Sequence, residues 1–215
     1  EEMFALQDLL GRHGVKNIDC RQDGAAFNPA SGRGSYLFNA TIEGIDQADA
    51  ILLVGTNPRL EAPVLNARIR KRWRQGGLAV GLIGQGADLA YGAEHLGAGP
   101  QTLNDLIEGR HMFAGVLKQA KRPMIILGAA AAARTDGAIV LSAVARLAQT
   151  VMQGKEPAWN AFNVLHAAAS RVGGLDLRLV PGPGGLDTSG MLKAAESGAL
   201  DVLVLLGADE ITMAR

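Results

Sequence analysis

Four short runs of apolar residues punctuate the chain, and each of them closes on a glycine. The runs are AILLVG (50–55), LAVGLIG (78–84), PMIILG (123–128) and DVLVLLG (201–207). Continuous runs of this length, rich in Val, Ile and Leu, are typical of strands buried on both faces of a parallel sheet. A weaker strand is predicted at Leu177–Val180. The pattern therefore predicts a sheet whose strands come from distant parts of the sequence.

Segments with helical patterns alternate with these runs. They are residues 61–74, 135–151 and 159–172. The first has Leu65, Ile69 and Trp73 at four-residue spacing, so one face of the helix is apolar. After residue 180, Thr188 or Ser189 could cap a further helix. Alternating strands and helices predict an α/β fold, doubly wound, with mostly parallel sheets and helices on both faces.

Two of the apolar runs share a longer pattern. DAILLVG begins at Asp49 and DVLVLLG begins at Asp201, and the turns that follow read Gly55-Thr56-Asn57 and Gly207-Ala208-Asp209. Any two strand–turn–helix units share much of this pattern, so coincidence is one interpretation. The other is a chain with two similar α/β halves, about 36–150 and 151–215.

Composition narrows the function classes. The chain has 215 residues, 48% of them apolar, and 21 basic residues balance 21 acidic ones. A neutral chain has no general attraction to nucleic acid or to an anionic membrane. The apolar runs are far shorter than the roughly 20 residues of a membrane-spanning helix. We therefore expect neither nucleic-acid binding nor direct membrane insertion.

Local charge is less even than the total. Five of the seven residues from Arg68 to Arg74 are Arg or Lys. These residues could bind nucleic acid, but Trp73, the one aromatic among them, falls on the apolar stripe. We favour a solvated helix face or a docking surface for an acidic partner.

Candidate metal and redox residues are few. Cys20 is the single cysteine, so the chain can form no internal disulfide, and an iron–sulfur cluster needs about four thiolates. The histidines are scattered at positions 13, 95, 111 and 166 without metal-binding spacing, so we predict no metal site. His166 falls in the helix predicted over 159–172 and is interpreted as a packed or capping residue. Asp136 and Asp209 are explained by capping.

The turn Gly55-Thr56-Asn57-Pro58 is the main candidate binding site. A glycine turn between a strand and a helix can bind phosphate, with Thr56 and Asn57 donating hydrogen bonds. It can also be a tight corner, where Gly permits an unusual φ and Pro begins the next element. A glycine at a strand end is a weak signal, so the residues alone favour a corner. The chain lacks the dinucleotide fingerprint, the GxxxxGK[ST] loop and the GxSxG elbow.

Three stretches together resemble one known family. They are GTNPRLEAPVLNARIRKRW, PMIILGAAAAARTDGAIVLSAV and LLGADE. The chain resembles the large iron–sulfur (75-kDa-type) subunits of respiratory NADH:quinone oxidoreductase, complex I, in their molybdopterin-oxidoreductase-like region. The resemblance covers nearly the whole chain and is most specific over DQADAILLVGTNPRLEAPVLNARIRK. The stretch RQDGAAFNPASGRG is longer than in the mitochondrial pattern, which indicates a bacterial version.

The resemblance implies a structural role. The family's iron–sulfur clusters lie in an N-terminal part that this segment lacks, and no residue here is placed as a molybdenum ligand. In related formate dehydrogenases, turns like Gly55-Thr56-Asn57 bind a pterin dinucleotide, so the resemblance implies a vestigial cofactor turn. The expected partners are other peripheral-arm subunits of complex I, on the cytoplasmic side of the inner membrane. We also expect a piece of a longer protein, because the chain begins inside a helical pattern without Met and stops just after a predicted strand.

Two alternatives stay open at this point. The segment could belong to an active molybdopterin oxidoreductase, such as a formate dehydrogenase, with pterin dinucleotide bound near Gly55–Asn57 and Gly207–Asp209. It could also be the central domain of a thiamine-type enzyme, which would bind a nucleotide cofactor such as FAD.

Overall fold

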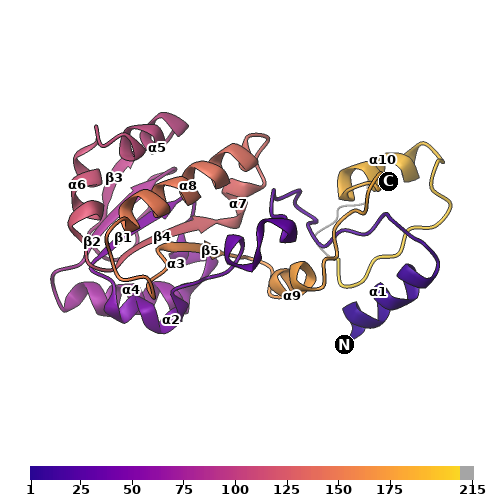
Figure 1. Ribbon diagram of the computed structural model, residues 1–215, viewed down its shortest axis with the longest axis horizontal. Helices are drawn as coiled ribbons and strands as arrows, with labels where there is room; N and C mark the ends of the chain where they lie inside the picture. The colour runs from indigo at the N-terminus through magenta and orange to yellow at the C-terminus, as the bar shows by residue number, and fades with distance from the viewer. Residues whose placement is uncertain (209–215) are drawn as a thin grey trace.

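A five-stranded parallel sheet forms the larger of two lobes in the computed structural model, which describes residues 1–208 (Figure 1). The strands are β1 (Ala50–Val54), β2 (Ala79–Ile83), β3 (Glu94–Gly97), β4 (Pro123–Gly128) and β5 (Phe162–Leu165). Their order across the sheet is β3-β2-β1-β4-β5, and every pair runs parallel. The chain thus builds the sheet outward from β1 in one direction and then in the other, which confirms the doubly wound prediction.

Helices cover both faces of this sheet. In the large lobe they are α2 (Thr41–Gly44), α3 (Pro58–Glu61), α4 (Pro63–Arg74), α5 (Pro100–Ile107), α6 (Met112–Gln119), α7 (Ala129–Ala132) and α8 (Gly137–Met152), with a 3₁₀ turn at Ile45–Gln47. Two further 3₁₀ turns, Pro29–Ser31 and Arg33–Ser35, precede them.

Alternate residues of β1 belong to two separate hydrophobic cores. Leu52 and Val54 pack with the apolar residues of α5, α6 and α8. Ile51 and Leu53 pack with Leu65 and other apolar residues of α4 and the 45–47 turn. Because successive side chains of a strand point to opposite faces, a run with no polar residue requires cover on both sides. The observed three-layer α/β/α arrangement provides that cover.

Two of the predicted helices are confirmed. The segment 61–74 forms α4, which Pro63 begins, with Leu65 and Ile69 buried. Trp73 is 37% exposed, so the apolar stripe weakens at the last turn. The segment 135–151 forms α8, whose buried residues repeat at helical spacing.

The prediction of a helix over 159–172 is wrong. Residues 162–165 form β5, which is fully buried, and α9 (Arg171–Asp176) follows after a short loop. β5 pairs with β4, with Phe162 opposite Ile125. Its central Asn163 is also buried, but its side chain accepts a hydrogen bond from the Ala40 amide and donates one to the Ala161 carbonyl. The strand β3 carries too little apolar pattern to be predicted, because it is half exposed at the sheet edge.

The smaller lobe contains α1 (Glu2–Arg12), α9 and α10 (Thr188–Glu196), joined by long irregular segments (Figure 1). The strands predicted at 177–180 and 201–207 are absent, so both predictions are wrong for this structure. Asp187, rather than Thr188 or Ser189, caps α10, since its Oδ1 accepts a 2.7 Å hydrogen bond from the Gly190 amide. The proposed division into halves at about residue 150 stays a prediction, although β5 joins the first sheet.

Candidate functional site

The turn after β1 lies where the sheet reverses its winding direction. β2 and β4 flank β1 on either side, so the carboxyl ends of β1 and β4 bound the position at which open α/β sheets bind ligands. Gly55 has φ +57°, a left-handed conformation that favours glycine. The candidate residues Gly55, Thr56 and Asn57 therefore lie at the carboxyl end of β1, beside this reversal point.

This position is filled by the protein itself. The short helix α7 begins directly after β4, and a Cβ built on Gly55 would lie 2.7 Å from the Cβ of Ala131. A Cβ on Gly128 would overlap the carbonyl oxygen of Gly55. Because both residues are glycines, the turn after β1 can pack closely against the turn after β4 and against α7. They leave the β1 turn no open space on the α7 side.

A carboxylate occupies the polar side of the same turn. Glu61 accepts hydrogen bonds from the Thr56 hydroxyl at 2.8 Å and from the Asn57 amide at 2.6 Å. The Asn57 side chain accepts a 3.1 Å bond from the Arg59 amide and so caps α3. The donors that a phosphate would need are already paired with an internal anion, which would also repel a phosphate. The turn in this form does not fit the pyrophosphate of a pterin dinucleotide.

The turn at Gly207 follows the second of the two similar apolar runs, DVLVLLG. Its glycine has a backbone conformation similar to that of Gly55, but its surroundings differ. Gly207 has φ +56°, close to the value at Gly55. A Cβ on Gly207 would meet nothing within 4 Å, and Val202 before it is 73% exposed. Asp209 lies outside the described residues.

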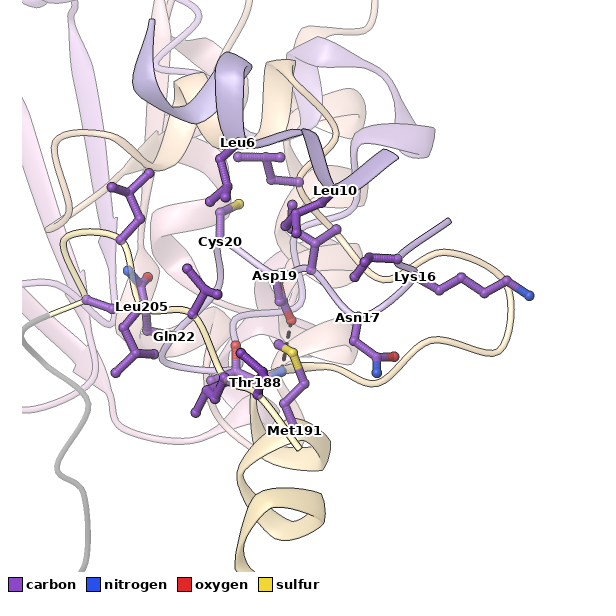
Figure 2. A pocket seen from close by; sticks show the side chains of 18 of the residues that line it. Leu6, Leu10, Lys16, Asn17, Asp19, Cys20, Gln22, Thr188, Met191 and Leu205 are labelled. Carbon is purple, nitrogen blue, oxygen red and sulfur yellow. Dashed lines mark hydrogen bonds between the residues drawn. The ribbon is translucent and has the colours of Figure 1, made fainter. Parts of the chain in front are cut away.

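A cavity of about 710 Å³ lies in the smaller lobe (Figure 2). Its walls come from α1, residues 13–22, α10 and residues 200–208, and most of its lining side chains are aliphatic. Asp19 also lines it and is paired, with Arg21 and the Thr188 amide as donors. The cavity is therefore an apolar space with few groups capable of catalysis.

Cys20 lines this cavity (Figure 2) but is a poor nucleophile. Burial, and secondarily the charge of Asp19, raises the pKa of its thiol to about 11. A thiol with that pKa is protonated at neutral pH, whereas reactive cysteines have lowered values. Cys20 instead packs against Gly174, where a Cβ would lie 2.7 Å from the Cys20 Cβ.

A second, smaller pocket of about 240 Å³ lies at the carboxyl ends of β4 and β5. His166 and Arg171 are among its polar lining residues, and Asp23 lies beside Arg171, with Oδ1 and Nη1 3.0 Å apart. Sequence reasoning placed His166 inside a helix and therefore missed this site. His166 lies one residue after β5, and this position could be predicted only by recognising that strand.

Three further candidate residues, His95, His111 and Asp136, make local contacts. His111 caps α6, accepting a 3.1 Å hydrogen bond from the Phe113 amide. His95 lies 2.8 Å from the carbonyl oxygen of Gly84. Asp136 occupies the position before α8, but its carboxylate pairs with Arg134 instead of capping, so that prediction is wrong.

The basic part of α4 is partly tied to neighbouring segments. Arg68 pairs with Asp46 at 2.6 Å, and the Arg70 Nε donates to the Ala90 carbonyl at 3.2 Å. The Arg72 Nη1 donates to the Gly76 carbonyl. Some basic residues of α4 therefore hold neighbouring segments in place, and the others face solvent.

Neither a metal-binding cluster nor a membrane-spanning helix is present in the part of the chain that the structure describes. In residues 1–208, no group of three or more His, Cys, Asp and Glu side chains could hold a metal ion. Over the same range, every helix is too short or too polar to cross a bilayer.

Comparison with known proteins gives a consistent family. A family model described as molybdopterin oxidoreductase matches residues 1–215. The chain is 43% identical over 213 residues to the mitochondrial NADH dehydrogenase [ubiquinone] iron-sulfur protein 1 of Solanum tuberosum, covering 99% of this chain and 27% of that protein. It is 40% identical over 212 residues to an NADH-quinone oxidoreductase subunit of Rickettsia bellii, covering 98% of this chain and 29% of that protein.

A third relative is the NADH-ubiquinone oxidoreductase 75 kDa subunit of Reclinomonas americana, 40% identical over 225 residues, with 98% of this chain and 32% of that protein covered. The chain thus spans about a third or less of the length of these curated relatives. The similarity confirms the family that the sequence motifs indicated.

Proposed function

The chain belongs to the molybdopterin oxidoreductase family, and we propose that it is a structural segment of the large iron–sulfur subunit of an NADH:quinone oxidoreductase, complex I. The observation that carries the proposal is 40–43% identity over nearly the whole chain to proteins named as subunits of that enzyme. The assembled enzyme would pass electrons from NADH to quinone. This segment would support the electron-carrying parts without taking part in the chemistry.

The geometry of the β1 turn supports a structural role. Gly55, Thr56 and Asn57 would be a vestigial cofactor turn that now serves as a corner. The Glu61 carboxylate accepts the hydrogen bonds that the Thr56 hydroxyl and the Asn57 amide donate, and Ala131 packs against Gly55. A cofactor-binding turn needs free donors, because phosphate oxygens are held by backbone and hydroxyl groups.

The iron–sulfur clusters would be held by another part of the parent chain. Cys20 is the only cysteine here, and it is half buried with a raised pKa, whereas cluster ligands are thiolates. The segment would therefore need no cofactor of its own.

The partners would be other peripheral-arm subunits, and the complex would hold the segment at the cytoplasmic side of the inner membrane. The exposed apolar side chains of Leu60 and Val64 lie at the junction of α3 and α4, next to the basic residues of α4. Such a mixed surface suits a docking contact with an acidic neighbour.

The test is purification of the parent protein, tagged in its source organism, from solubilised membranes. Mass spectrometry of the companions and an assay of NADH oxidation would follow. We expect a large assembly that reduces quinone. A small soluble complex containing molybdenum would overturn the proposal.

The family itself favours one alternative, an active molybdopterin oxidoreductase. That alternative requires a pterin dinucleotide in the parent protein, which would be detected by the fluorescence of its oxidised pterin. Its repeated absence from purified parent protein would exclude the alternative. The family match gives no support to a thiamine-type enzyme.

A further inference from the structure

The small pocket at the ends of β4 and β5 contains polar atoms that the described structure leaves without hydrogen-bond partners. Ala129 follows β4, His166 follows β5, and Arg171 begins α9. The atoms concerned are the His166 Nδ1 and the Arg171 Nε and Nη1, and all three are buried. Buried polar groups normally have partners, so these atoms indicate a missing one.

The hydrogen bond made by the His166 Nε2 determines whether the Nδ1 of the same ring is a donor or an acceptor. The Nε2 lies 2.7 Å from the carbonyl oxygen of Tyr36. A carbonyl oxygen only accepts, so Nε2 carries the hydrogen and the neutral ring presents a bare lone pair at Nδ1. Burial lowers the pKa of His166, and the nearby Arg171 lowers it further against the opposing effects of the Tyr36 carbonyl and Asp23. Nδ1 is therefore an acceptor that calls for a donor.

Arg171, in contrast, has buried N–H donors that lack acceptors. Its side chain is only 4% exposed, and its one charged partner in the described structure is Asp23, with Nη1 and Oδ1 3.0 Å apart but not aligned for a hydrogen bond. Asp23 is 40% exposed and also accepts a hydrogen bond from the Ala25 amide. A buried guanidinium has five N–H donors, and a single ion pair leaves most of them unused. The pocket therefore offers strong donors beside one acceptor.

We propose that this pocket binds a small oxyacid anion that still carries a proton, such as dihydrogen phosphate or bicarbonate. The charged oxygens of the anion accept from Arg171, and its remaining O–H donates to the His166 Nδ1. A volume of about 240 Å³ admits an ion of this size together with water. The inference concerns a site separate from the β1 turn and does not depend on the role in complex I.

This arrangement makes a sharp distinction between phosphate and sulfate. The two ions have nearly the same size and shape, but sulfate carries no proton at neutral pH. Bound sulfate would place an oxygen lone pair against the lone pair of Nδ1. A site that hydrogen-bonds a substrate proton rejects analogues lacking it, because its own polar atom is left unpaired. We expect phosphate to bind roughly tenfold or more tightly than sulfate.

The experiment is a titration of the protein with inorganic phosphate and, separately, with sulfate, at pH 7 and constant ionic strength. Calorimetry measures the affinity, and the NMR signals of isotope-labelled histidine rings locate the binding. We expect phosphate to shift the His166 signals and sulfate to have little effect. No phosphate-dependent shift at His166, as expected if water alone fills the pocket, would overturn the proposal. An equal response to both anions would also overturn it.

Variants separate recognition from folding. His166→Gln can turn either its carbonyl or its amide toward the anion, so its preference for phosphate over sulfate should fall to about twofold or less. His95→Gln is the matched control, since His95 also contacts a backbone carbonyl but lies on β3, outside the pocket. It should bind phosphate as the original protein does. A loss of preference in this control would contradict the site.

Asp23→Asn tests the role of Arg171 without removing it. If Arg171 binds the anion, loss of the competing carboxylate should strengthen the binding of phosphate severalfold. If Arg171 serves only as the ion-pair partner of Asp23, the variant should lower the melting temperature with no gain in binding, and the proposal fails. A thermal melt of each variant shows whether it remains folded.

Discussion

At the scale of single residues, Glu61 decides the character of the turn after β1. Its carboxylate takes the Thr56 hydroxyl and the Asn57 amide, which are the groups that the sequence offered to a phosphate. Glu61 follows Asn57, which caps α3, by four positions and Thr56 by five, whereas the capping box has a spacing of three, so this competition was not visible as that motif. What the sequence did not reveal is that the carboxylate turns back and accepts hydrogen bonds from the turn.

Replacing Glu61 with Ala should destabilise the protein by about 1–2 kcal/mol, because two hydrogen bonds to a charged acceptor are lost and the buried Thr56 hydroxyl loses its partner. Urea unfolding followed by circular dichroism measures this. Glu43→Ala, at another exposed helical position, is the control and should change little. An unchanged midpoint for the Glu61 variant would mean that these hydrogen bonds do not form in solution.

Gly55→Val should harm folding more than any binding. The substitution places a β-branched residue at φ +57° and drives its Cβ into Ala131. Strain and overpacking together should cost at least about 2 kcal/mol. Gly76→Val is the matched control, since Gly76 has φ +82° but open space around it. Thermal melting compares the two, and equal losses would show that strain alone, without the contact to Ala131, accounts for the effect.

His166 should make stability depend on pH. Its pKa in the folded protein is lowered by burial below the ordinary value of 6.5, so the unfolded chain takes up the proton first. Stability is therefore full above about pH 6.5 and falls as the pH drops from there toward the lower folded pKa. Urea midpoints between pH 8 and 5, in buffers free of phosphate, measure this. The slope should shrink in His166→Gln and persist in His95→Gln.

At the scale of elements, the helix α4 combines a buried side with a basic one. Leu65 and Ile69 lie in the core, whereas Arg70 and Arg74 are exposed. The sequence predicted this division from four-residue spacing alone, since helix periodicity is a local property. The ion pair from Arg68 to Asp46 could not be predicted, because it joins the helix to a turn 22 residues earlier.

Reversing the charge at both Arg70 and Arg74 should leave the protein folded, with a change of about 0.5 kcal/mol or less per site, as is usual for exposed positions. Cooperative thermal unfolding is the measurement. Arg68→Glu should cause a larger loss, because it sets two carboxylates side by side at Asp46. Loss of cooperative unfolding in the double variant would show that the basic face is part of the fold.

At the scale of the whole molecule, the two lobes differ in how fully they bury their apolar residues. The sheet lobe has one core on each face. The smaller lobe has an apolar cavity of about 710 Å³ and leaves Val202, Val204, Leu205 and Leu206 exposed. Contiguous exposed apolar residues mark interaction surfaces. Since the relatives are three to four times longer, we expect further parts of the parent protein to cover this surface.

Hydrogen exchange tests that expectation. In the 215-residue chain, the amides of residues 202–206 should exchange quickly, and in the full-length parent they should slow by roughly a hundredfold or more. The amides of Ile51 and Leu53, inside β1, are the internal control and should be slow in both. Fast exchange of residues 202–206 in the parent as well would mean that this surface faces solvent there too.

The apolar run 201–207 shows that a local sequence pattern is not enough to predict a strand. It has the same pattern as β1, and its glycine has nearly the same φ, yet it forms no strand here. A strand needs a neighbour for its backbone hydrogen bonds, and β1 has two, β2 and β4. In contrast, the short apolar run of β5 fits both the helix period and the strand period, and only its pairing with β4 decides for a strand.

The sequence by itself determined the fold class, three of the five strands, the two long helices of the sheet lobe and the family. These depend on hydrophobic periodicity and on motifs, which are properties of neighbouring residues. Tertiary structure alone decided the pairing of β5, the filling of the β1 turn by Ala131 and the pocket of His166 and Arg171. Each of these joins segments that are far apart in the chain, and no local pattern specifies which distant groups will meet.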